Sequence, residues 1–338
     1  MTISRRKQEH IDIASNRRIR FRRKTNGFEK VDFVHCALPE LNLSDIETGV
    51  SFLGRELAFP LMITAITGGF PGARKINADL AETCQTERIA LGLGSQRQLF
   101  ENDRYVESYR IVRQKAPDIP LVGNIGAAEI IGHRDFSPFR RLVDLIEADA
   151  LAVHLNALQE RLQPEGGTDF RGVLDALGRL VRDIPVPVIV KETGCGVSRE
   201  TAQRLADIGV RFLDVAGAGG TSWAGIESFR SPDNRLAREF WDWGIPTAFS
   251  LRMASDIPEL TLIASGGLEN GIDLAKAVAL GARLGGAALP FLGVWRRKKL
   301  DGLISEVRTW KEAFRTVLWL TGSASPSGLR REHILYEI

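Results

Sequence analysis

The passage richest in reactive side chains lies near the middle of the chain. His154 and Asn156 are two residues apart, so on a β-strand their side chains share one face, and Gln159 and Glu160 follow directly. One carboxylate beside amides and an imidazole suits Mg²⁺, which keeps several waters and takes one or two protein carboxylates. Zn²⁺ is disfavoured because no second histidine or cysteine is placed nearby. From the residues alone, Glu160 is equally consistent with a surface carboxylate.

Lys191 is a second candidate, because it ends the apolar run 187–191. A lysine in such a place can form a Schiff base with a carbonyl substrate. It can also stabilise negative charge at N1 and C2–O2 of a reduced flavin. A salt bridge to Glu192 or to another neighbour is the structural alternative, and the residues leave these three readings open.

Two later segments carry paired glycines at the ends of apolar runs. Gly266 and Gly267 follow one run, and Gly285 and Gly286 lie in the next. Glycines allow backbone N–H groups to approach a phosphate closely, and a helix that begins near Gly271 adds its positive end. Tight turns alone would also use glycine, but its presence in both segments favours a phosphate site.

These residues belong to a repeated pattern of strands and helices. Short apolar runs alternate with amphipathic stretches that predict helices, and such alternation is typical of βα units around a buried parallel sheet. The predicted strands are 61–64, 89–92, 121–124, 150–154, 187–191, 212–215, 261–265 and 284–288. Eight strands close a (β/α)8 TIM barrel. An open doubly wound sheet is disfavoured because the loop after the first run lacks a GxGxxG turn.

We therefore expect one α/β domain over residues 1–338, with an N-terminal extension over 1–58 and a barrel over 59–338. The extension is expected to cover one end of the barrel or to reach over its active site. Residues 243–251 resemble a ninth strand, but we interpret them as a helix with Pro246 in its first turn. The glycine-rich segment 217–242 is long enough to predict a functional loop.

Active sites of such barrels lie at the C-terminal ends of the strands. The residues at the ends of the predicted strands are therefore candidates for the active site. The strand-end residues are Ala65, Thr67, Ser95, Arg97, Asn124, His154, Asn156, Lys191, Ala216, Gly266, Gly267, Ala287 and Ala288. Only Arg97 and Lys191 among them carry a permanent charge, so the predicted site is largely uncharged.

Composition excludes several classes of protein. The net charge is only +3, and we interpret the basic run 17–24 as a solvated or subunit-facing helix, so no nucleic-acid partner is expected. The three cysteines, Cys36, Cys84 and Cys195, form no CxxC pair and indicate a reducing compartment. Neither a signal peptide nor a membrane span is apparent, so a cytoplasmic protein is predicted.

An ordered set of motifs makes the chain resemble the type 2 isopentenyl-diphosphate isomerase family over nearly its whole length. The matching segments are Arg6-Lys7-Gln8-Glu9-His10, Ala37-Leu38-Pro39-Glu40-Leu41, Thr67-Gly68-Gly69, Gly94-Ser95-Gln96-Arg97, Asn124-Ile125-Gly126-Ala127, His154-Leu155-Asn156, Gln159-Glu160, Gln163-Pro164-Glu165-Gly166, Val190-Lys191-Glu192 and Ala216-Gly217-Ala218-Gly219-Gly220-Thr221-Ser222-Trp223-Ala224. Each motif is weak alone, but the last two are close to diagnostic.

The resemblance implies interconversion of isopentenyl and dimethylallyl diphosphate in isoprenoid biosynthesis, with Mg²⁺ and with FMN reduced by NADPH or NADH. The implied FMN contacts are Ala65, Ile66, Thr67, Ser95, Asn124, Lys191, Thr221, Gly266, Gly267, Ala287 and Ala288. The implied substrate contacts are Arg6, Lys7, Ser95, Gln96, Arg97, His154 and Gln159. Gln159, His154 and Lys191 are the expected catalytic residues, and Glu160 is the expected Mg²⁺ ligand.

The implied chemistry fits these side chains. The diphosphate is an anion that cations and Mg²⁺ would hold. The reaction adds a proton at C4 of an unactivated alkene and removes one from C2, and a reduced flavin offers both a proton at N5 and anionic density. The family also tends to form tetramers or octamers. Two departures are Ile66, where methionine is frequent, and Gly167, where aspartate is frequent; a changed loop rather than a lost metal is expected.

Two rival readings come from other classes. An FMN-dependent 2-hydroxy-acid oxidase or dehydrogenase needs a histidine base beyond the sixth strand. None of the five histidines, His10, His35, His133, His154 and His333, lies there. A non-catalytic sensor of phosphate ligands would not need Gln159 and Glu160 beside a flavin.

Overall fold

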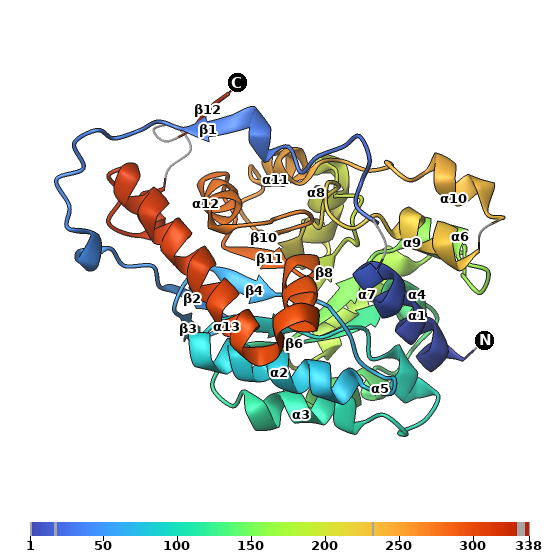
Figure 1. Ribbon diagram of the computed structural model, residues 1–338. Coiled ribbons are helices and arrows are strands. Elements are labelled where there is room, and N and C mark those ends of the chain that lie inside the picture. The colour runs from blue at the N-terminus through green and yellow to red at the C-terminus, as the bar shows by residue number, and fades with distance from the viewer. Residues whose placement is uncertain (1, 17–18, 232, 330–334, 338) are drawn as a thin grey trace.

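The computed structural model describes residues 2–16, 19–231, 233–329 and 335–337. Eight parallel strands close into a barrel in the order β10-β11-β4-β5-β6-β7-β8-β9 (Figure 1). Their bounds are β4 Leu61–Ile63, β5 Ala90–Gly92, β6 Leu121–Gly126, β7 Ala150–His154, β8 Val188–Lys191, β9 Phe212–Asp214, β10 Thr261–Ser265 and β11 Leu284–Ala287. Each lies within two residues of a predicted apolar run, so the (β/α)8 prediction is confirmed.

Helices surround the barrel, and shorter helices lie in its loops. The longer ones are α2 Ala73–Glu87, α3 Glu107–Lys115, α5 Ser137–Asp144, α7 Val173–Asp183, α8 Arg199–Asp207, α9 Trp223–Arg230, α11 Thr247–Ala254, α12 Gly271–Ala279 and α13 Leu289–Leu320. The shorter ones are α4 Ala127–Ile130, α6 Ala157–Leu162, α10 Arg235–Glu239, η1 Phe28–Lys30, η2 Leu43–Asp45, η3 Arg97–Phe100 and η4 Pro326–Gly328. The predicted helix near Pro246 exists, but Pro246 caps α11 instead of entering its first turn.

The N-terminal extension contributes to both ends of the barrel. Its elements are α1 Ile3–Asn16, β1 Val31–Phe33, β2 Val50–Phe52 and β3 Arg55–Leu57, and β1 pairs antiparallel with β12 Leu335–Glu337. Helix α1 packs against α9 and α13 (Figure 1). The β2–β3 hairpin packs Val50, Phe52 and Leu57 against interior residues of the barrel strands. The extension therefore reaches over the site at one end and closes the barrel at the other.

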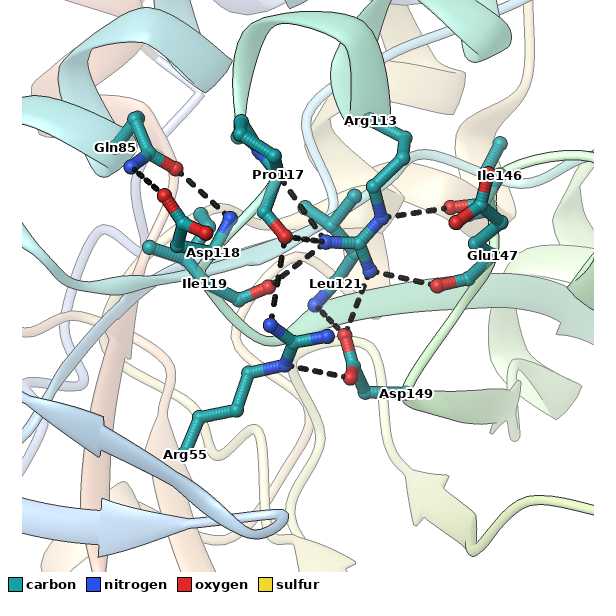
Figure 2. A network of polar contacts seen from close by, with 11 residues as sticks. Arg55, Gln85, Arg113, Pro117, Asp118, Ile119, Leu121, Ile146, Glu147 and Asp149 are labelled. Carbon is teal, nitrogen blue, oxygen red and sulfur yellow. Dashed lines mark hydrogen bonds and ion pairs between the residues drawn. The ribbon is translucent and has the colours of Figure 1, made fainter.

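A polar network holds the hairpin beneath the barrel (Figure 2). Asp149, just before β7, accepts a hydrogen bond from Arg55 of β3 at 2.8 Å and another from Arg113 of α3 at 2.8 Å. The remaining Arg113 contacts are the carbonyl oxygens of Ala116, Pro117, Ile119, Ile146 and Glu147. The Asp149 carboxylate and the backbone carbonyl oxygens accept the hydrogen bonds of both arginines, and these bonds close this end of the barrel.

The prediction of a helix over the basic run is wrong for its described part. Residues 17 and 18 lie outside the described residues, and 19–24 contain no helix. Instead, the segment runs alongside the loop after β9: Arg20 forms a bridge with Thr221, and the Phe21 N–H donates to the Gly220 carbonyl. Pairing with this loop holds the segment beside the mouth of the barrel.

None of the described helices combines the length and apolar character required to cross a membrane.

Candidate active site

A cavity lies at the C-terminal ends of the strands and is roofed by α1. Nearly all of the predicted site residues line its wall. These are Arg6, Lys7, Ala65, Ile66, Thr67, Ser95, Arg97, Asn124, His154, Gln159, Glu160, Lys191, Thr221, Gly266, Gly267, Ala287 and Ala288. Residues from all along the barrel, such as Ala65 and Ala288, thus meet at one place, because parallel strands present their C-terminal ends at the same face.

Gln96 is the predicted contact that the structure does not bring to the cavity. Its side chain is fully buried behind the strands, donating to the Leu142 carbonyl and accepting from the Asn124 N–H, both at 3.0 Å. Its neighbours Ser95 and Arg97 do face the cavity. In place of the predicted substrate contact, the Gln96 side chain fixes the loop after β5 to β6 and to α5.

Two cations on α1 face the cavity from above. Lys7 donates to the carbonyl oxygens of Gly68 and Ser95 and to the hydroxyl of Tyr109, so it also ties α1 to the loops after β4 and β5. Burial, together with the neighbouring charges of Arg6 and Arg97, lowers the pKa of Lys7 to about 7. An anion bound here would reverse that effect, because it would favour the charged amine.

Arg97 completes the cationic side of the cavity. It forms a 2.9 Å ion pair with Glu129 of α4, and both side chains are only partly exposed. Burial raises the pKa of the Glu129 carboxyl, and Arg97 opposes this rise. The pair holds Arg97 in place, while Arg6, Lys7 and Arg97 together leave more positive than negative charge around this part of the cavity.

His154 ends β7 and is held in one tautomer. Its Nδ1 lies 2.7 Å from Asn124 Oδ1, and the Asn124 amide donates its own hydrogen to the Leu93 carbonyl. The Asn124 oxygen therefore accepts, so Nδ1 carries the proton. Burial lowers the pKa of His154 to about 3, with smaller contributions from the nearby charges of Lys191, Lys7, Arg97 and Arg6. Before an anion binds, His154 is a neutral hydrogen-bonding group rather than a cation.

Glu160 is buried on α6 and presents a single carboxylate to the cavity. Oε1 accepts from the Asn156 amide and Oε2 accepts from the Gly167 N–H, each at 2.9 Å. The departure at Gly167 does not remove this bond, since the backbone supplies it. Among the described residues, no group of three or more His, Cys, Asp or Glu side chains is placed to hold a metal. A cation held here would take one carboxylate and complete its ligands from elsewhere.

Buried atoms without partners indicate where ligands fit. The Thr67 hydroxyl and the Asn156 side-chain oxygen are buried, and neither has a hydrogen-bond partner in the described part of the chain. Leaving such a group unpaired costs about 1–3 kcal/mol. Both residues line the cavity. Thr67 therefore fits a polar ligand atom at the end of β4, and the Asn156 oxygen fits a cation beside Glu160.

The floor of the cavity combines backbone turns with one amine. Gly266 and Gly267 have φ angles of 102° and 86°, which side chains rarely adopt, and a Cβ on Gly266 would lie 2.1 Å from the Gly217 carbonyl oxygen. The Lys191 amine donates to the Glu192 carbonyl at 2.6 Å. The floor is therefore smooth and nearly uncharged apart from Lys191, which suits a flat ring system with a phosphate at its end.

Sequence reasoning missed several residues that support α1. His10 Nε2 lies 3.0 Å from Glu227 Oε1, and its ring meets Trp223 edge to face. Glu227 also accepts from Arg230 at 2.6 Å. Tyr109 packs beneath Gly68 and Gly69 and donates to the Ser95 carbonyl at 2.9 Å. The matched motif at residues 6–10 does contain His10, but nothing local in the sequence marks its distant partners.

Solved structures with a similar fold include an oxidase and a flavocytochrome. One, described as a lactate oxidase of Pediococcus acidilactici, has a TM-score of 0.70 at 16% identity over 99% of this chain and 93% of that one. A flavocytochrome b2 mutant with pyruvate bound has a TM-score of 0.70 at 17% identity, over 96% of this chain and 82% of that one. At such low identity these similarities establish the fold alone. The family model for FMN-dependent dehydrogenases matches residues 159–336.

Much closer similarity is found to proteins named isopentenyl-diphosphate delta-isomerase. The protein of Chlorobium limicola is 46% identical over 98% of this chain and 95% of its own length. Those of Pseudescherichia vulneris and Methanothermobacter thermautotrophicus are 47% and 44% identical, each over 98% of this chain and more than nine-tenths of their own. Identity at this level over the whole length is decisive, and the chain belongs to the isopentenyl-diphosphate delta-isomerase family.

Proposed function

We propose that this protein is an enzyme that interconverts isopentenyl and dimethylallyl diphosphate, with reduced FMN bound in the cavity. The observation that carries the proposal is the division of the cavity into two sides. Arg6, Lys7 and Arg97 gather at the side beneath α1, whereas the floor is nearly uncharged apart from Lys191. A diphosphate with a short hydrocarbon tail is divided in the same way.

The cationic side is assigned to the diphosphate. Arg97 is held by Glu129 and can offer its remaining N–H groups, and Lys7 is held among oxygen acceptors beside it. Binding of the anion raises the pKa of Lys7 from about 7, so the amine becomes fully charged. The Nδ1 of His154 is bonded to Asn124, so Nε2 is the ring nitrogen that can take up a proton when the anion binds.

The floor is assigned to FMN, whose ring contacts would include Thr67, Asn124 and Lys191, with the phosphate at Gly266, Gly267, Ala287 and Ala288. The unpaired Thr67 hydroxyl supports this assignment. In its reduced form, FMN supplies the proton donor and acceptor of the allylic rearrangement. Gln159 lines the cavity and is assigned to orient the reacting alkene.

Mg²⁺ is assigned to Glu160 and Asn156. Glu160 is buried and already oriented by two hydrogen bonds, and the Asn156 oxygen lacks a partner among the described residues. Mg²⁺ commonly takes few protein ligands and completes its octahedron with water and phosphate oxygens. The substrate diphosphate would supply those oxygens.

The hydroxy-acid oxidase reading is weaker, although the fold and the family model are shared with such enzymes. The loop after β9, residues 217–222, contains no histidine to act as a base, and the nearby histidine, His10, is bonded to Glu227. The only other histidine in the cavity wall described here, His154, is bonded to Asn124. These contacts do not favour oxidation of a 2-hydroxy acid.

Three further proposals accompany the activity. NADPH is proposed as the reductant of FMN. A homo-oligomer, a tetramer or an octamer, is proposed because the family resemblance implies one. A cytoplasmic location is proposed because Cys36, Cys84 and Cys195 are free, which suits a reducing compartment.

The test is an anaerobic incubation of the purified protein with FMN, NADPH, Mg²⁺ and isopentenyl diphosphate, scored for dimethylallyl diphosphate. We expect product, and we expect it to disappear when FMN, the reductant or Mg²⁺ is omitted. If FMN is bound and reduced but no product forms, the isomerase proposal is wrong, and tight binding without turnover would favour the sensor.

A further inference from the structure

Asp214 is a buried carboxylate to which the proposed reaction gives no role. It ends β9, and its exposed fraction is only 1%. Together with Lys191, Thr64 and Asn124 it lines a small space inside the barrel. A carboxylate at such a place is costly unless its charge and its oxygens are matched by partners.

Lys191 is one of those partners. Lys191 and Asp214 occupy paired positions on the neighbouring parallel strands β8 and β9, so their side chains point to the same face. The Lys191 Nζ lies 4.0 Å from Asp214 Oδ2. Glu192, the other nearby carboxylate, is turned instead toward the backbone N–H groups of Thr193 and Cys195. Asp214 is therefore the carboxylate that faces the Lys191 amine from inside the barrel.

The same carboxylate fixes two turns in the cavity floor. Asp214 Oδ1 accepts from the Ser265 hydroxyl at 2.7 Å, from the Ser265 N–H at 3.1 Å and from the Ala216 N–H at 3.2 Å. Ser265 is followed directly by the Gly266 turn. Ala216 has a φ of 38°, a left-handed conformation that is costly for a residue other than glycine. One side chain thus holds the ends of β8, β9 and β10 together.

We infer that Asp214 is a positioning residue for the cofactor: it aims the Lys191 amine and the Ser265–Gly266 turn at the floor on which FMN lies. The inference rests on the proposed FMN site but not on the isomerization. Asp214 does not itself reach the cavity wall, so the inference predicts that Asp214 acts mainly through Lys191. Burial raises the pKa of Asp214, and Lys191 and the Ser265 hydrogen bonds oppose this rise.

The test is a double-mutant cycle on FMN affinity, measured by quenching of flavin fluorescence in the apoprotein. We expect Asp214→Asn to weaken FMN binding about tenfold in the wild-type background. In the Lys191→Met background the same change should weaken binding by less than about twofold, since the amine that Asp214 positions is gone. Equal loss in both backgrounds would overturn the inference. Asp79→Asn is the matched control, because Asp79 is a buried carboxylate of α2 bonded to Trp295, and it should leave FMN affinity unchanged.

A second measurement does not need FMN to bind. Lys191→Met leaves Asp214 without its cation, so we expect the Tm of the apoprotein to fall by about 5 °C, and the added Asp214→Asn should restore at least half of that loss. Additive losses would show that the two side chains do not interact and would sink the inference. If Asp214→Asn alone does not fold, Ser265→Ala replaces it in the FMN-affinity cycle, where we expect the same sign and a smaller effect. Wild-type protein that binds no FMN would contradict the proposed function. The Tm cycle would still show whether Lys191 and Asp214 interact.

Discussion

The two ends of the barrel use charge in opposite ways. At the N-terminal end, Asp149 is shared by Arg55 and Arg113, whose other donors meet backbone carbonyls. At the C-terminal end, Arg6, Lys7 and Arg97 lie close together, and the pKa of Lys7 is lowered to about 7. The difference teaches that one end of the barrel is bonded for stability, whereas the other gathers an excess of positive charge that an anionic ligand would balance.

If this comparison is right, changes at the two ends should separate activity from stability. The largest effect is expected for Glu160→Gln at the site. Because glutamine cannot supply the anionic oxygen for Mg²⁺, we expect turnover to fall about 1000-fold at any Mg²⁺ concentration, with little change in Tm. Steady-state kinetics across an Mg²⁺ series would measure this. Recovery of full activity at high Mg²⁺ would mean that Glu160 only tunes affinity.

Lys7→Met should lower kcat/KM about 100-fold, mainly by raising KM, because the diphosphate loses a charged hydrogen bond. Its Tm should change by only a few degrees, because removing a buried amine with a lowered pKa offsets the loss of the hydrogen bonds that tie α1 to the loops after β4 and β5. Lys115→Met is the matched control: Lys115 is an exposed lysine paired with Glu82, far from the cavity wall, and its loss should alter neither quantity. A large fall in the Tm of Lys7→Met would contradict the contrast between the ends.

Asp149→Asn should show the reverse pattern. It leaves Arg55 and Arg113 without their carboxylate, and the loss of about 2 kcal/mol should lower Tm by about 5 °C. We expect kcat and KM to remain within about twofold of wild type, because the network lies at the opposite end from the site. Thermal denaturation and kinetics on the same preparation would check both halves. A tenfold fall in kcat with unchanged Tm would be incompatible with a purely structural role.

The smallest effect is expected from pH. The pKa of Lys7 is about 7 in the free protein, so KM should rise above pH 7 as the amine loses its proton, by about tenfold per unit at most. The stability of the folded chain should respond to pH in the opposite way, improving as pH rises above 7. The unfolded chain holds this proton up to its ordinary pKa of 10.5, so it binds more protons than the folded chain between pH 7 and 10.5, and this lysine adds stability as pH rises there. In Lys7→Met, the rise in KM should be absent.

The fold and most of the site could be predicted because both follow local patterns. Buried parallel strands are apolar on both faces, and their C-terminal ends name the cavity residues, as at His154 and Lys191. Gln96 could not be placed, because it lies between two cavity residues and its direction depends on the turn into η3. His10 and Glu227 are 217 residues apart, and Tyr109 lies on a helix, so only the folded chain reveals their contacts.

The most direct test of the account is to offer the same FMN-loaded protein two substrates under anaerobic conditions. With isopentenyl diphosphate, Mg²⁺ and prereduced FMN, the account predicts dimethylallyl diphosphate and a flavin that is still reduced when the product has formed. With oxidised FMN and lactate, it predicts no bleaching of the flavin. Bleaching by lactate, together with no dimethylallyl diphosphate, would contradict the isomerase and favour a hydroxy-acid oxidase built on the same barrel.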